Sequence, residues 1–192
     1  MSPPRQYLEY DGTMQTYEEI RQQYKPKKIA VLLIAESPPP ASHIQSSRHF
    51  YRTDRIRTDD RLFVNTIKTL YPETTGLKEL DLEKDKDHWL KKLQTDGYYM
   101  IEALEESQVH EVTKKERQAK ISISLPRLLE RVRKLASKDT KIILIKSNVF
   151  ESAAQPLRQA GFTVLNTRLL DYPGRFNQAA YRQKLAQMIA NI

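Results

Sequence analysis

The fold is decided by residues 28–40, KIAVLLIAESPPP, in which an apolar run meets a carboxylate and three prolines. Apolar residues follow one another without alternation, which is typical of a strand buried on both faces of a sheet. The prolines lack a backbone donor and fix φ, so the chain must leave the strand at this point. The stretch therefore predicts a buried parallel strand over residues 28–34, with Glu36 at its carboxyl end.

Further strands and helices follow from the same patterns. Residues 141–145 (KIILI) form a second apolar strand, and residues 97–101 and 162–165 are strand-like. Helical spacing and stop signals predict helices over residues 17–24, 61–70, 85–93, 126–136, 147–159 and 178–192. Alternation of buried strands and helices predicts an α/β fold, with a four-stranded parallel sheet in three α/β/α layers.

Local chemistry places the ends of several of these helices. Asp59 or Asp60 is a suitable N-cap for the helix over residues 61–70, and Tyr71 followed by proline should end it. Pro126 is expected in the first turn of its helix. Ser147 and Asn148 are expected to cap the helix that follows KIILI.

The length and the net charge of the chain limit the number of domains and the kinds of partner that we expect. The 192 residues suffice for one domain, and no repeat or linker divides them, so we expect one domain with residues 1–27 packed on it as an N-terminal extension. The net charge of +8 favours DNA or a nucleotide as partner, although many basic proteins bind no nucleic acid. The absence of cysteine excludes disulfides and thiolate metal sites.

Membrane insertion is not expected. The longest apolar run, residues 29–35, is too short to span a bilayer, and the N-terminus lacks the apolar segment of a signal peptide. We therefore expect a soluble, cytoplasmic protein with no membrane partner.

The carboxyl ends of the strands should form the ligand crevice, because right-handed crossovers bring them to one edge of the sheet. The segments expected to meet there are residues 36–40, 102–107, 147–148 and 171–175. Glu36, partly desolvated at a strand end, could act as a general base or stabilise a cation. The alternative is a solvated glutamate followed by a stiff loop.

An arginine-rich loop follows that strand. Residues 42–61 contain His43, Arg48, His49, Phe50, Tyr51, Arg52, Arg55, Arg57 and Arg61. Two adjacent aromatic residues among five arginines suit stacking on a base and contact with phosphates. The alternative is a solvated basic loop whose aromatic pair plugs the core. The two histidines lack the spacing of metal ligands, so no metal site is expected.

Residues near the C-terminus form a further candidate binding segment, and several common catalytic motifs are absent from the sequence. In residues 171–175 (DYPGR), Tyr172 could stack or donate a hydrogen bond and Arg175 could hold a phosphate, unless the segment is only a turn. Residues 113–120 are expected to be a solvated helix face, with a specific contact as the alternative. The sequence contains no G-x-G-x-x-G, P-loop, G-x-S-x-G or H-E-x-x-H motif, which argues against dinucleotide, NTPase, esterase and zinc-protease sites. No cofactor is expected.

At these same points the chain resembles the uracil-DNA glycosylase superfamily. Residues 34–39 (IAESPP) resemble its first motif, Gly-Glu-Ala-Pro-Gly, with Glu36 on the glutamate and Pro38 on the proline. Ser37 stands where other branches have a water-positioning Asp. Residues 61–70 resemble the family's helix after the aromatic loop, and residues 141–150 resemble its third strand and the helix that follows. Tyr172 begins the segment that matches His-Pro-Ser.

The resemblance implies a hydrolase of the N-glycosidic bond of a DNA base or nucleotide. Glu36 and Tyr172 would be catalytic. The implied base-binding residues are Ser37, Pro38, Phe50, Tyr51 and Glu102, and the phosphate-binding residues are Arg48, Arg52, Ser147, Asn148 and Arg175. Tyr172 replaces the family's His, and Glu102 replaces an Asn that reads the base edge, so base specificity should be altered.

Two other functions remain open from the sequence. The chain could be a catalytically inactive module that binds nucleic acid or a nucleotide on the same fold. A fold of this type could also serve a small anionic metabolite.

Overall fold

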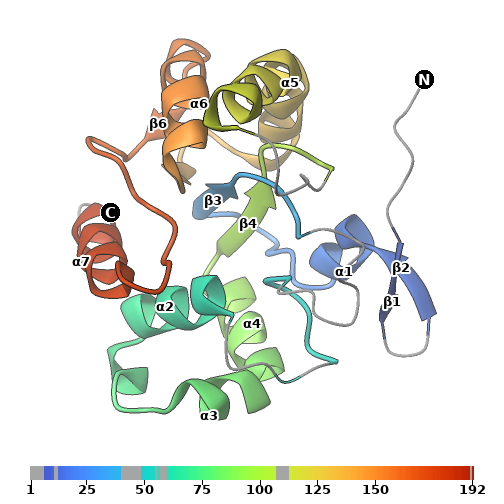
Figure 1. Cartoon of the computed structure of the whole chain (residues 1–192), viewed down its shortest axis with the longest axis vertical. Helices are drawn as coiled ribbons and strands as arrows, with labels where there is room; N and C mark the ends of the chain where they lie inside the picture. The colour runs from blue at the N-terminus through green and yellow to red at the C-terminus, as the bar shows by residue number, and fades with distance from the viewer. Residues whose placement is uncertain are drawn as a thin grey trace.

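A computed structural model describes residues 7–10, 13–39, 49–54, 56, 60–106, 113–190 and 192, with side chains described from Thr16 onward. A four-stranded sheet in the order β4-β3-β5-β6 forms its centre (Figure 1). The strands are β3 (Val31–Ala35), β4 (Tyr98–Glu102), β5 (Lys141–Leu144) and β6 (Thr163–Val164). Every pair in this sheet is parallel, which confirms the predicted α/β class.

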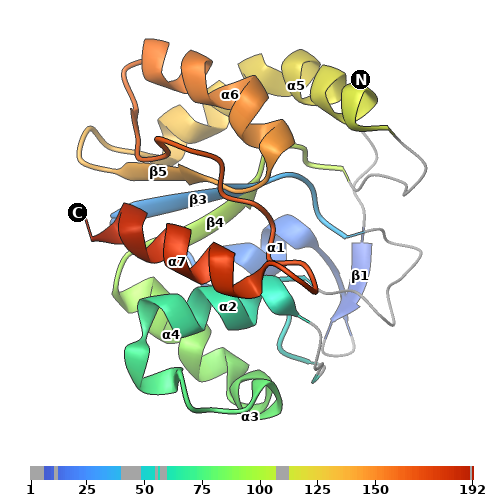
Figure 2. The ribbon, with the colours of Figure 1, turned by 60° about the vertical axis from the view of Figure 1, so that its left-hand side comes forward.

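Helices cover both faces of the sheet (Figures 1 and 2). On one face lie α5 (Lys114–Leu135) and α6 (Ser147–Gln159), and on the other lie α2 (Arg61–Leu70), α4 (Lys86–Thr95) and α7 (Gln178–Ile189). The short α3 (Glu79–Lys84) and η2 (Pro72–Thr74) join α2 to α4. Beside α1 (Tyr17–Gln22) is a hairpin of β1 (Tyr7–Tyr10) and β2 (Thr13–Thr16). The sequence patterns predicted neither the hairpin nor α3.

The apolar runs became strands because both of their faces are covered. All five residues of β3 are buried, as are the apolar residues of β5. The residues with no exposed surface include Ile20, Leu32, Ile34, Phe63, Leu90, Val132, Ile143, Leu157 and Leu185. These residues come from both helical layers, from α1 and from the sheet, so one core joins the extension to the domain.

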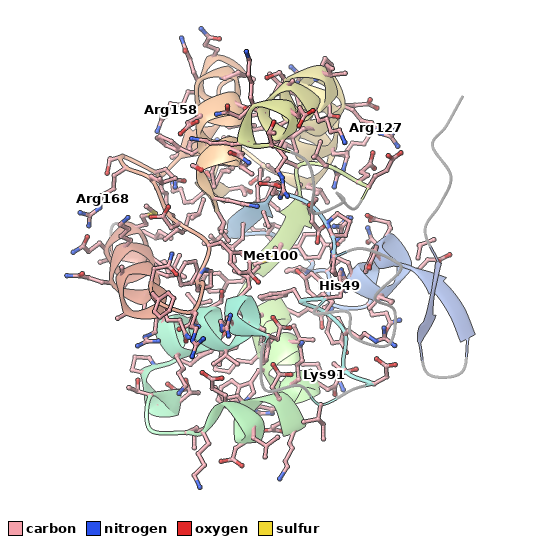
Figure 3. The ribbon with its side chains drawn as sticks, viewed as in Figure 1. His49, Lys91, Met100, Arg127, Arg158 and Arg168 are labelled. Carbon is pink, nitrogen blue, oxygen red and sulfur yellow. The ribbon has the colours of Figure 1, made fainter. Side chains whose placement is uncertain are left out.

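Among the described residues, side chains and not another strand cover the outer edge of β4. Tyr51 Oη lies 2.6 Å from the backbone nitrogen of Met100 and 3.2 Å from its carbonyl oxygen. Arg131 Nη1 donates to the carbonyl of Glu102 over 3.0 Å. An unpaired strand edge is open to pairing with another chain, and these contacts satisfy part of it. Figure 3 shows Met100 between the helical layers.

Helix ends match the local signals in some places only. α2 spans Arg61–Leu70 as predicted, with Asp60 as the N-cap accepting from Phe63 N. The prediction that a helix begins near Pro126 is wrong, since α5 begins at Lys114, where Thr113 and Glu116 form a capping box. Pro126 is exposed within this helix, and so is Ser122, the residue four positions earlier whose carbonyl loses its donor to the proline.

The predicted cap of α6 is also wrong. Ser147 and Asn148 are the first helical residues, and the N-cap position is Lys146, which makes no side-chain capping bond. The physical reason is that the Asn148 amide is directed toward Glu36 and not toward the backbone of its own helix. The predicted fourth strand is short, but a parallel bridge between Ile145 and Leu170 extends the contact of its segment with β5.

Candidate functional site at the carboxyl edge of the sheet

Glu36 lies directly after the central strand β3 and is only 5% exposed. Its carboxylate contacts donors from two helices and one strand end. Arg117 Nη1 lies 3.1 Å from Oε1, while Asn148 Nδ2 and Lys146 Nζ lie 3.0 and 2.7 Å from Oε2. The sequence predicted Glu36 at this edge, and the structure adds three donors that hold it.

Lys146 occupies the junction between β5 and α6 in a strained conformation. Its φ is +84° and its ψ is +144°, and no other non-glycine residue among the described ones has a positive φ. This region is adopted almost only by glycine, and it costs any other residue roughly 1–3 kcal/mol. Such strain is most often found at functional sites. The backbone nitrogen of Lys146 donates to the carbonyl of Leu170 over 2.7 Å, which fixes the start of the following turn.

Asn148 supplies an unused acceptor beside Glu36. A carboxylate only accepts hydrogen bonds, so the amide nitrogen of Asn148 must face Glu36 and its Oδ1 must face away. That oxygen is buried and has no hydrogen-bond partner among the described residues. Buried polar atoms are normally satisfied, so this acceptor is suited to a water or to an N–H donor of a ligand.

The turn after Leu170 brings a second group of predicted residues to this edge. Asp171 accepts from Lys184 Nζ at 3.1 Å, and Asn177 Nδ2 donates to the carbonyl of Tyr172 at 2.8 Å. Tyr172 is 38% exposed and Arg175 is exposed. Phe176, which the sequence patterns did not select, is 93% exposed. The sequence signal that could have indicated Phe176 is an aromatic residue next to an arginine in a polar turn.

Glu102, predicted to read a base edge, is instead held in a second cluster at the end of β4. Its carboxylate pairs with Arg21 of α1, a residue that no sequence pattern indicated. His49 Nε2 lies 3.8 Å from the other carboxylate oxygen. The His49 ring is buried against Tyr17, and burial together with the charges of Arg21 and Lys86 lowers its pKa well below the ordinary value. Figure 3 shows His49 near α1.

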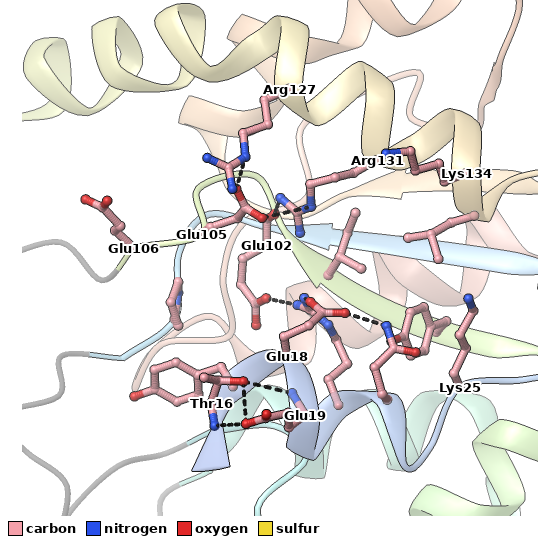
Figure 4. Close-up of a pocket in the computed structure, with 17 residues that line it drawn as sticks. Thr16, Glu18, Glu19, Lys25, Glu102, Glu105, Glu106, Arg127, Arg131 and Lys134 are labelled. Atoms are coloured by element: carbon pink, nitrogen blue, oxygen red, sulfur yellow. Dashed lines mark hydrogen bonds and ion pairs between the residues drawn. The ribbon is translucent and has the colours of Figure 1, made fainter. Parts of the chain in front are cut away.

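A pocket of about 600 Å³ adjoins this second cluster (Figure 4). It lies between α1 and the C-terminal half of α5, and Pro38, Tyr99 and Glu102 contribute to its wall. Pro38 is itself buried, whereas Ser37 is half-buried and does not line this pocket. Of the predicted base-binding residues, the structure therefore brings Pro38 and Glu102 together.

The arginine-rich loop does not present its aromatic residues. Phe50 packs edge-on against Phe63 at 5.8 Å, and Tyr51 binds the Met100 backbone, so both rings are buried in the core. Arg52 is 2% exposed, and its Nε lies 2.5 Å from Asp54. Predictions that Phe50 or Tyr51 stacks on a base and that Arg52 binds phosphate are therefore corrected, because burial and pairing already occupy these side chains. The predicted phosphate-binding Arg48 lies outside the described residues, and so do His43, Arg55 and Arg57.

The remaining predicted phosphate contacts differ in availability. Ser147 is half-buried in the first turn of α6, a position that suits an anion. The Asn148 side chain is instead engaged with Glu36. Within the described ranges, no group of three or more His, Asp or Glu side chains could hold a metal ion.

Among the helices of the described residues, none combines the length and apolarity that crossing a bilayer requires. Comparison with known protein families, with curated proteins and with solved structures finds no match to this chain.

Proposed function

We propose that this protein hydrolyses the N-glycosidic bond of a DNA base or nucleotide, in the manner of the uracil-DNA glycosylases but with altered base specificity. The observation that carries the proposal is the pairing of Glu36 with Asn148. The Asn148 amide joins the buried Glu36 carboxylate to a second buried acceptor, its own Oδ1, which has no partner among the described residues, and both lie at the edge of a parallel sheet. Such a pair can orient a water molecule, whose two protons need two acceptors.

The reaction follows from these acceptors. The oriented water adds to the anomeric carbon of the sugar while the bond to the base nitrogen breaks and the base leaves with the bonding electrons. Positive charge develops on the sugar and negative charge on the departing base. Glu36 would stabilise the sugar, and Lys146 and Arg117, which face it, would stabilise the base. One water proton finally goes to the base and the hydroxyl stays on the sugar.

Substrate recognition is assigned to the turn that follows Leu170. Phe176 offers an exposed ring for stacking on a base, and the guanidinium of Arg175 lies 5.6 Å from that ring. Aromatic rings with adjacent cations are the usual platform for single-stranded nucleic acid. Tyr172 is the candidate donor to the base, as a neutral phenol in place of a histidine.

Oligonucleotides carrying uracil, hypoxanthine, xanthine or an alkylated base test the proposal. Single- and double-stranded forms are incubated with the protein, treated with hot alkali and analysed for strand breaks. Wild type should cleave one of these substrates. Glu151→Gln should cleave it equally well, because Glu151 lies on α6 with its side chain partly exposed and pairs with Lys114 of α5 instead of contacting Glu36. Glu36→Gln should lose roughly 100-fold or more of the rate. Equal cleavage by Glu36→Gln would remove Glu36 from the mechanism.

A second candidate function is binding without hydrolysis. It is favoured by the contact of Glu36 with two cations, because these offset the charge with which it would stabilise a sugar cation. Tight binding that weakens steeply with salt, with no strand breaks on any substrate, would support this function instead.

A further inference from the structure

The pocket between α1 and α5 is separate from the Glu36 acceptor pair, and neither Glu36 nor Asn148 lines it (Figure 4). Its volume of about 600 Å³ lies within the range of sites for small organic ligands, roughly 300–1,000 Å³. Apolar surface comes from Tyr17, Tyr99, Ile101 and Leu135. Such a mixture of apolar walls and a few polar groups is typical of ligand sites.

The acidic side chains of this pocket, Glu106 included, already have partners. Glu18 and Glu102 pair with Arg21, and Glu105 pairs with Arg127. Glu19 accepts from the Thr16 backbone at 2.6 Å and from its hydroxyl at 2.8 Å. The carboxylates therefore have little capacity left to bind a cationic ligand.

The basic side chains, in contrast, have donors to spare. Nε of Arg21 and Nη2 of Arg131 are buried and have no hydrogen-bond partner among the described residues, and the same holds for the hydroxyl of Tyr99, which interacts with Arg21. Lys25 also lines the pocket, and its ammonium group has no ion-pair partner within the described ranges. The charged atoms that lie buried in this lining without a partner are thus donors, which an anion would satisfy.

Arg131 is the residue best able to reach a ligand. Its Nη1 donates to the Glu102 carbonyl, but its contact with Glu105 is long, at 3.7 Å from Nε to Oε1. Burial, and next the neighbouring charge of Arg21, lower the pKa of Arg131 below its ordinary value. An anion placed against the two guanidiniums would relieve their repulsion, and Arg131, which is held at hydrogen-bond distance through Nη1 alone, would have to turn the buried Nη2 toward it.

We propose that this pocket binds a small organic anion, with a carboxylate or phosphate group on Arg131 beside Arg21 and an apolar body against Tyr99 and Leu135. Lys25 adds a further positive charge to the same pocket. This inference is independent of the hydrolase proposal, because it rests on no residue of the Glu36 acceptor pair.

Benzoate and phenyl phosphate are suitable probes, with benzamide as the neutral control, and binding to the full chain is measured by calorimetry. We expect saturable one-to-one binding of at least one anion and none of benzamide. The relative affinity of the two anions identifies the preferred group. Equal affinity for benzamide, or no saturable binding of either anion at millimolar concentration, would overturn the proposal.

Variants locate the site. Arg131→Gln should weaken binding about tenfold or more, because it removes charge-assisted hydrogen bonds. Arg133→Gln should leave binding unchanged, since Arg133 is exposed on the same helix and outside the pocket. If Arg131→Gln fails to fold, Lys25→Gln at the half-buried pocket wall replaces it, with a several-fold loss expected.

Two outcomes separate this proposal from the function assigned to Glu36. Retention of the anion's affinity in Glu36→Gln would support a distinct pocket, whatever that variant does to strand cleavage. Loss of the affinity in Glu36→Gln, with Arg131→Gln unaffected, would place the anion at Glu36 and overturn the inference.

Discussion

The ammonium group of Lys146 lies 2.7 Å from Glu36 Oε2, and the backbone that carries it has φ of +84°. The two residues follow neighbouring parallel strands, β5 and β3, so the sheet itself brings the charges together. A lysine in a conformation that suits glycine is retained against a local cost, and the ion pair with Glu36 is the gain that we assign to it.

Lys146→Gly and Lys146→Met separate the cost of the backbone strain from the gain of the ion pair with Glu36. Both remove an ion pair whose lysine is about one-third exposed, but only glycine removes the strain. We expect Lys146→Gly to be more stable than Lys146→Met by about 1 kcal/mol or more, measured by urea unfolding. Both should lower any activity that depends on Glu36. A glycine variant less stable than the methionine variant would show that the backbone is not strained.

Tyr51→Phe should destabilise the protein, because it removes the hydroxyl that contacts both the N–H and the carbonyl of Met100. Leaving two buried backbone groups unsatisfied should cost about 2–4 kcal/mol. Tyr98→Phe is the matched control on the same strand, since Tyr98 is half-buried, and it should change stability by less than about 0.5 kcal/mol. Similar unfolding midpoints for the two variants would show that the Tyr51 hydroxyl does not protect this edge.

His49 should make stability depend on pH below neutrality. Its folded-state pKa is lowered by burial and by neighbouring cations, so the unfolded chain binds a proton that the folded protein excludes. The stability is then fully present above the unfolded pKa, near 6.5, and decreases as the pH falls below it, by up to about 1.4 kcal/mol per unit.

Urea unfolding between pH 7.5 and 5.5 measures this effect. His49→Gln should flatten the dependence, whereas His88→Gln should preserve it because His88 is exposed. A dependence that is unchanged in His49→Gln would assign it to other groups.

Phe176→Ala should weaken nucleic-acid binding without changing stability, because the ring is almost fully exposed. Loss of one stacking contact is worth roughly 1–3 kcal/mol, or about five-fold to more than 100-fold in affinity. Ile123→Ala removes another exposed apolar side chain, 80% exposed on α5, and should leave the affinity unchanged. Fluorescence anisotropy with a labelled single strand measures both. Equal losses in the two variants would indicate nonspecific apolar contact.

Some helix bounds could be predicted from the local sequence. The bounds of α2 agree with the prediction because its signals are adjacent to it, with Asp60 capping one end and Tyr71-Pro72 closing the other. Residues 113–120 were expected to be a helix face, but the start of α5 was placed at Pro126 instead of at its capping box of Thr113 and Glu116, because the first turns carry few apolar residues. The aromatic pair Phe50-Tyr51 was compatible with exposure or burial, and only packing against Phe63 and Met100 decides between them.

By itself the sequence determined the two buried strands, the α/β class and the position of Glu36 at a strand end, because unbroken apolar runs and prolines act on the neighbouring backbone. The tertiary structure alone decided what Glu36 contacts, since Arg117 and Asn148 are 81 and 112 residues away along the chain. It also placed Arg21 against Glu102, across a separation of 81 residues. Backbone conformation responds to near neighbours, whereas the pairing of buried charges depends on which segments the folded sheet brings together.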